Sequence, residues 1–92
     1  MKLGWTPEAL ADLTHIRCVI ARTRPVAANK VVRHIKASTR LLLEQPRLGR
    51  EGRIPGTREW LVTGSPYVVS CLVREDVILI LRIIHTSIDW RA

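Results

Sequence analysis

The sequence predicts an α+β domain in which two N-terminal helices pack on a mostly antiparallel, twisted sheet. Between residues 7 and 44, apolar residues recur at helical spacing. Between residues 52 and 85, they form short runs rich in valine and isoleucine, separated by turn residues. The expected order is β-α-α-β-β-β-β, and the length suits a single domain over residues 1–92.

The first strand and the first helix are predicted from the start of the chain. Residues 2–5 form a short strand, and Thr6-Pro7-Glu8 supplies an N-cap, a proline at the first helical position and an acid near the helix N-terminus. The helix should run to about residue 22. Its buried stripe consists of Ala9, Leu13, Ile16 and Ile20.

A second helix is predicted from Pro25 to about Glu44. Its apolar side carries Ala28, Val31, Ile35, Thr39 and Leu42, and its basic side carries Lys30, Arg33, Lys36 and Arg40. No acidic residue occurs between Asp12 and Glu44, so the helical pair has a concentrated positive charge. This basic side is either a solvated face or a surface that contacts nucleic acid or another partner.

Glycine and proline mark the turns that separate the remaining strands. A loop with three arginines, Arg47, Arg50 and Arg53, leads to a short strand at about 52–54 and, after a turn at Gly56, to a strand over 58–63. Gly64-Ser65 is expected to form a two-residue hairpin turn. Strands follow over 67–73 and 77–84, and because both are apolar on their two faces, at least one should be central in the sheet.

Composition indicates a basic protein of the cytoplasm. Fifteen Lys and Arg, most of them arginine, against eight Asp and Glu give a net charge of +7, which favours polyanionic partners such as RNA, DNA or an acidic peptide. The N-terminus lacks the apolar run of a signal peptide, and no run is long enough to span a membrane. Cys18 and Cys71 are expected to be reduced thiols of the core.

Three residues stand out as candidates for function because they interrupt apolar strands: Arg58, Arg82 and His85. Each arginine is either a phosphate clamp or a structural side chain, and Arg82 could pair with Glu59 or Glu75. Imidazole titrates near neutrality, which makes His85 a candidate general acid or base. Strand alternation places Arg82 with Ile78, Ile80 and Ile84, on the face opposite His85.

Other classes of site lack the residues that they need. His15 and Cys18 have ligand-like spacing but no further metal ligands are evident. The chain has no glycine-rich phosphate loop, and neither Ser65 nor Ser70 has the surroundings of an activated nucleophile. We therefore expect no metal and no cofactor.

The chain resembles the RelE/ParE superfamily of toxins from type II toxin–antitoxin modules. The similarity is carried by G-R-x-x-G-T-R-E-W-L-V from Gly52, by Thr63 to Tyr67, by V-I-L-I-L-R-I-I-H from Val77, and by Asp89-Trp90. It implies a small βααβββ toxin domain and a cognate antitoxin whose acidic, amphipathic segment covers the working surface.

The resemblance leaves two mechanisms open. RelE-like members cut mRNA on the ribosome without metal, and on that reading Arg58, Arg82 and His85 are the catalytic residues. Arg50 and Arg53, together with Lys30, Arg33, Lys36 and Arg40, then bind nucleic acid. ParE-like members inhibit DNA gyrase without catalysis, and there His85 and Trp90 only pack the chain end. The sequence favours mRNA cleavage because His85 otherwise has no role.

Overall fold

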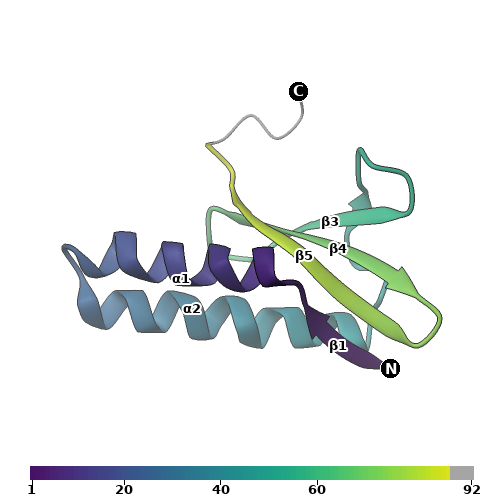
Figure 1. The fold of residues 1–92 in the computed structure, drawn as a ribbon, viewed down its shortest axis with the longest axis horizontal. Helices are drawn as coiled ribbons and strands as arrows, with labels where there is room; N and C mark the ends of the chain where they lie inside the picture. The colour runs from purple at the N-terminus through teal and green to yellow at the C-terminus, as the bar shows by residue number, and fades with distance from the viewer. Residues whose placement is uncertain (88–92) are drawn as a thin grey trace.

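The computed structural model describes residues 1–87 and confirms the predicted α+β fold (Figure 1). Two helices pack beside a five-stranded sheet, and a short 3₁₀ helix follows the second of them. The elements are β1 (Lys2–Trp5), α1 (Pro7–Ala21), α2 (Pro25–Thr39), η1 (Arg40–Leu43), β2 (Arg50–Glu51), β3 (Thr57–Leu61), β4 (Tyr67–Arg74) and β5 (Val77–His85). Their order along the chain is the predicted one.

The sheet has the strand order β1-β5-β4-β3-β2. β1 runs parallel to β5, from the pair Lys2–Val77 to the pair Trp5–Ile80, and every other pairing is antiparallel. The two most apolar strands, β4 and β5, are both interior, which confirms the prediction that at least one of them is central. Because β1 is short, β5 continues for five residues beyond the last residue that β1 pairs.

The start of α1 is fixed by Thr6, the predicted N-cap. The Thr6 hydroxyl accepts a hydrogen bond from the Ala9 N–H at 3.1 Å, and Pro7 occupies the first turn. The same hydroxyl donates to the Leu81 carbonyl of β5 at 2.9 Å. One side chain therefore caps the helix and joins it to the central strand.

The second helix is shorter than predicted. α2 ends at Thr39, and the chain then tightens into η1. The Thr39 hydroxyl donates to the Lys36 carbonyl at 2.7 Å, and the Arg40 N–H bonds to the Ala37 carbonyl three residues earlier. Leu42 is fully buried nevertheless, so the apolar stripe continues through the 3₁₀ turn.

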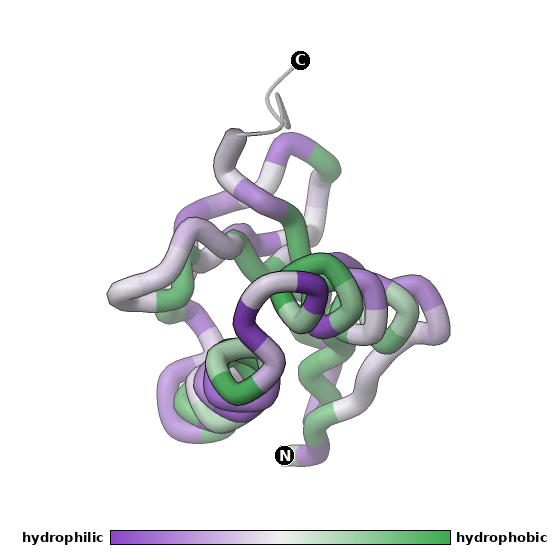
Figure 2. The backbone as a smooth tube through the Cα atoms, turned by 90° about the vertical axis from the view of Figure 1, so that its left-hand side faces the viewer, coloured by the Kyte–Doolittle hydropathy of each residue, from purple (hydrophilic) through white to green (hydrophobic). Residues whose placement is uncertain are grey.

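The core lies where α1, α2 and η1 meet the sheet. It is mainly aliphatic and consists of Ala9, Leu13, Ile16, Ile35, Leu42, Val62, Tyr67, Val69, Cys71, Ile78, Ile80 and Ile83. In Figure 2, hydrophilic and hydrophobic residues alternate around the helical turns, as expected for helices with one buried side. Cys18 does not belong to this core: it is exposed because it falls outside the buried stripe of α1, which corrects the prediction for that thiol.

Two turns differ from the predicted ones. β3 ends at Leu61 and β4 begins at Tyr67, so five residues, 62–66, connect them instead of two. The Val62 N–H donates to the Tyr67 carbonyl at 2.9 Å across the base of this connection. Gly64 still supplies the positive φ, at 74°. The short strand expected at 52–54 lies at Arg50–Glu51 instead, and the chain then reaches β3 through a turn over 54–57 that the Thr57 N–H and the Ile54 carbonyl close.

Within residues 1–87, no helix combines the length and hydropathy that crossing a bilayer requires.

Candidate functional site

A β-bulge in β5 decides which way the candidate residues face. Two consecutive pairs flank it: Ser70 pairs with Arg82 and Cys71 pairs with Ile80. Leu81 is therefore the extra residue, and it reverses the alternation of side chains beyond it. Ile83, at 4% exposure, continues the buried row of Ile80. The predicted grouping of Arg82 with Ile78 and Ile80 is wrong for this reason.

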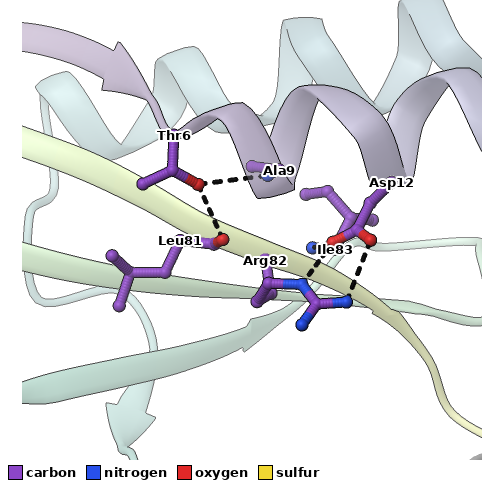
Figure 3. A network of polar contacts seen from close by, with 6 residues as sticks. All are labelled: Thr6, Ala9, Asp12, Leu81, Arg82 and Ile83. Carbon is purple, nitrogen blue, oxygen red and sulfur yellow. Dashed lines mark hydrogen bonds and ion pairs between the residues drawn. The ribbon is translucent and has the colours of Figure 1, made fainter.

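Arg82 is held by Asp12 of α1 (Figure 3). Its Nε lies 2.8 Å from Asp12 Oδ2, and its Nη2 lies 3.1 Å from Oδ1. This bidentate hydrogen bond, followed by the charge of Asp12, raises the pKa of Arg82. The side chain is 55% exposed, whereas that of Asp12 is 17% exposed. The predicted partners Glu59 and Glu75 are not involved.

The same carboxylate also completes the edge of β5. Beyond the end of β1, Asp12 Oδ2 accepts the Ile83 N–H at 2.9 Å, and the Thr6 hydroxyl donates to the Leu81 carbonyl (Figure 3). Two side chains at the start of α1 thus replace the missing neighbour strand. Asp12 has a structural role as well as an electrostatic one.

The ring of His85, the last residue of β5, packs against the ring of Tyr67, the first residue of β4. The two rings meet edge to face, with centroids 5.3 Å apart. His85 Nδ1 accepts the Ser87 N–H at 3.0 Å, and the Ser87 hydroxyl lies 2.7 Å from the same nitrogen. Because Nδ1 accepts, the neutral imidazole carries its proton on Nε2. In this arrangement neither nitrogen is ready to take a proton from a substrate.

Arg82 and His85 line one pocket of about 470 Å³, together with Asp12 and His15 of α1. They meet there although alternation places them on opposite faces of β5, because the Arg82 guanidinium reaches Asp12 of α1, which lines the same pocket. The remaining lining side chains are mainly apolar: Ile16, Val19, Tyr67, Ile83 and Ile84. The structure thus brings two of the three predicted catalytic residues together.

Arg58 lies away from this pocket, in a different part of the molecule. Its Nη2 donates to the carbonyls of Gly49, at 2.8 Å, and Arg47, at 3.3 Å. It lines a second groove, of about 1170 Å³, formed by the loop over 45–56 and by Val73 of β4. The groove shares no lining residue with the pocket of Arg82 and His85.

The predicted nucleic-acid-binding residues divide into two groups. Lys30, Arg33, Lys36 and Arg40 are all exposed along α2 and its C-cap. Arg50 forms a 3.7 Å ion pair with Glu59, which is nearly buried. Arg53 is exposed in the loop that follows β2. Trp90, the other aromatic singled out at the chain end, lies outside the described residues.

Asp12 and Tyr67 line the pocket but were not among the site residues predicted from the sequence. Asp12 is the last acid before the long basic stretch, which was a usable signal, but its partner lies 70 residues away. Tyr67 was recognised only as a strand residue. Among residues 1–87, no group of three or more His, Cys, Asp or Glu could hold a metal ion.

Sequence comparison finds relatives along almost the whole chain. Residues 3–90 match the family described as the ParE toxin of the type II toxin–antitoxin system parDE. The toxin-like protein Y4kP of Sinorhizobium fredii is 36% identical over 97% of this chain and 92% of its own length. Toxin RelE2 of Caulobacter vibrioides is 37% identical over 90% of this chain and 92% of its own length.

Solved structures agree with the sequence comparison. The chromosomal ParDE system of P. aeruginosa contains a chain that superposes with a TM-score of 0.85 and 31% identity, over 92% of this chain and 95% of that one. A mutant of YafQ from E. coli shares the fold, with a TM-score of 0.58 and 12% identity over 92% of each chain. The chain therefore belongs to the ParE toxin family and is a toxin of a type II toxin–antitoxin system, with an antitoxin as its partner.

Proposed function

We propose that this toxin acts in the cytoplasm as a ParE-like, non-enzymatic inhibitor of DNA gyrase. The observation that carries the proposal is the fork of Arg82 on Asp12, at 2.8 and 3.1 Å. A guanidinium edge that is already bound to a carboxylate is not available to clamp a phosphate through the same two N–H groups. The geometry thus favours the alternative that the sequence placed second.

Metal-free RNA cleavage needs a base, an acid and cations around one phosphate. Arg58 faces another groove and uses its Nη2 on loop carbonyls. His85 uses Nδ1 to accept the Ser87 N–H. The three residues that the RelE-like reading requires are therefore not assembled around one position.

A protein target fits the surface beside the Arg82 pocket. Val19 of α1 lines that pocket and is 44% exposed, and the exposed Arg82 and the apolar Ile84 line it beside Val19. Apolar side chains mixed with arginine are typical of protein interfaces. A surface for RNA would instead need exposed aromatic rings for stacking, and only four residues in the chain are Trp or Tyr.

Ribosome-dependent mRNA cleavage is the second candidate. It is favoured by one observation: Arg82, His85 and Tyr67 line a single pocket of about 470 Å³. On this proposal a substrate phosphate displaces Asp12 from Arg82, and the imidazole of His85 leaves Ser87. Arg58 then acts only through the loop that it holds.

Two assays on the same preparation separate the candidates. Purified toxin is added to a gyrase supercoiling reaction and, in parallel, to ribosomes programmed with mRNA. We expect inhibited supercoiling and intact transcripts. Cut transcripts with normal supercoiling would reverse the assignment. The complex of toxin with the antitoxin from the neighbouring reading frame is the matched control and should be inactive in both assays.

A further inference from the structure

The outer side of α2 carries a row of basic side chains. Lys30, Arg33, Lys36 and Arg40 follow one another at steps of three or four residues, and all of them are exposed. At about 100° and about 1.5 Å per residue, the row covers roughly 120° of the helix surface over about 15 Å. Within residues 1–87, none of the four forms an ion pair with a carboxylate. Their charges therefore face the solvent together.

The spacing of this row has a cost for the helix. Cations three or four residues apart on a helix repel each other and destabilise it. Each step along the row, from Lys30 to Arg40, is such a pair, and α2 has no acidic residue in its first turn that would compensate. The sequence also has no acidic residue between Asp12 and Glu44. A long anion from outside the protein would relieve the repulsion of every pair at once.

The first helix adds a further cation to the row. Arg17 of α1 and Lys36 of α2 line one hollow of about 170 Å³ between the two helices. The other lining residues are uncharged: Leu10, Leu13, Thr14 and Val32. The acids of α1 act elsewhere, since Asp12 binds Arg82 and the charge of Glu8 also acts on Arg82 (Figure 3). Two cations from different helices thus meet at a hollow where one phosphate group can bind.

The chemistry of the row favours the phosphate backbone of a nucleic-acid duplex. The one ring on α2, that of His34, is bonded to the Thr63 carbonyl at 2.8 Å, so stacking would contribute little to the binding of a single strand. The apolar side of α2, with Ala28 and Ile35, is buried in the protein and not available to a lipid surface. α2 packs along α1 at the border of the molecule (Figure 1). The major groove of B-DNA admits a helix, whereas that of A-form RNA is too narrow.

We propose that the basic row of α2, together with Arg17, binds duplex DNA through its phosphates. The hollow of Arg17 shares no lining residue with the pocket of Arg82 and His85, so DNA and a protein target would not compete for the same side chains. Every phosphate that the row neutralises releases condensed counter-ions, so the binding weakens steeply with salt. The inference goes beyond the target proposed above and does not depend on it.

The test compares two double variants that each lose one lysine and one arginine. Arg33→Gln with Lys36→Gln changes the row, and Lys2→Gln with Arg74→Gln removes two exposed cations that both pair with Val77 in the sheet. Purified toxin is titrated into a fluorescent DNA duplex of about 20 base pairs, and anisotropy is followed from about 50 to about 200 mM salt. For the wild type we expect a slope of about −4 in the logarithm of the binding constant against that of salt, and for the row variant about −2. The control variant should keep the slope of the wild type and bind at least tenfold more tightly than the row variant.

Equal slopes for the two double variants would overturn the proposal, since the binding would then reflect net charge alone. Tighter binding of the wild type to duplex RNA of the same sequence, to the separated strands or to phosphatidylserine vesicles than to the DNA duplex would also overturn it. If the row variant does not fold, Lys30→Gln and Arg40→Gln replace it, and each should reduce the slope by about 0.9. The assay contains neither gyrase nor ribosomes, so this proposal and the proposed function fail separately.

Discussion

At the scale of single residues, Asp12 accepts three hydrogen bonds beside the pocket. It binds the Arg82 fork and also accepts the Ile83 N–H. Because Arg82 is more than half exposed, the ion pair itself is screened by water and adds little to stability. The backbone hydrogen bond matters more, since the Ile83 N–H has no strand beside it.

Two substitutions of Asp12 should separate these contributions. Asp12→Asn keeps an oxygen for the Ile83 N–H and loses the charge, so we expect a loss of less than about 1 kcal/mol in the free energy of unfolding. Asp12→Ala removes the acceptor as well and should cost about 1–3 kcal/mol. Urea denaturation followed by circular dichroism measures both. If the two variants are equally stable, the carboxylate does not support the β5 edge.

The buried thiol of Cys71 predicts a pH dependence in alkali. Burial raises its pKa above the ordinary value of 9.0, so the unfolded chain loses this proton before the folded one does. The stability that depends on the neutral thiol is fully present below pH 9 and is lost as the pH rises through the folded value. The advantage of the wild type over Cys71→Ala should therefore be constant below pH 9 and shrink as the pH rises above it.

The exposed Cys18 provides the control for this measurement. Its side chain is exposed, so Cys18→Ala removes no buried thiol and should keep the pH dependence of the wild type, which comes from Cys71. Thermal unfolding in reducing buffer at several pH values measures all three proteins. A constant difference between wild type and Cys71→Ala would show that the thiol titrates equally in both states.

At the scale of elements, the junction of α1 and β5 depends on Thr6. Its hydroxyl caps the helix through the Ala9 N–H and binds the Leu81 carbonyl. We expect Thr6→Ala to lower the free energy of unfolding by about 1–2 kcal/mol, because it removes a cap and a second hydrogen bond. Thr14→Ala is the matched control, since that exposed hydroxyl only returns to the Leu10 carbonyl of its own helix. A control as damaging as Thr6→Ala would contradict this role.

The elements themselves were predictable from the sequence because their signals are local. The N-cap at Thr6, the spacing of Leu13 and Ile16 and the glycines at Gly56 and Gly64 all act within a few residues of each other. The site was less predictable because it depends on contacts between distant segments. The bulge in β5 reverses the side-chain alternation, so strict period two assigned Arg82 to the wrong face.

At the scale of the whole molecule, the candidate residues lie in two separate hollows of the surface. One region is the pocket between α1 and the end of β5, with Arg82 and His85. The other is the groove under the loop over 45–56, with Arg58. A single active site would bring these cations together, whereas a protein that acts by binding alone does not need to. This separation is consistent with a binding toxin.

Growth inhibition by a His85 variant tests whether the toxin acts by binding alone. His85→Gln removes the imidazole and keeps a polar side chain that can accept the Ser87 N–H. If the toxin works by binding, its potency should change less than about threefold. If His85 is a general acid or base, the rate should fall by about 10²–10⁴ and toxicity should disappear. The measurement is colony formation after expression without antitoxin, with protein levels matched by immunoblot. A non-toxic His85→Gln that is as stable as the wild type would contradict the gyrase proposal and favour RNA cleavage.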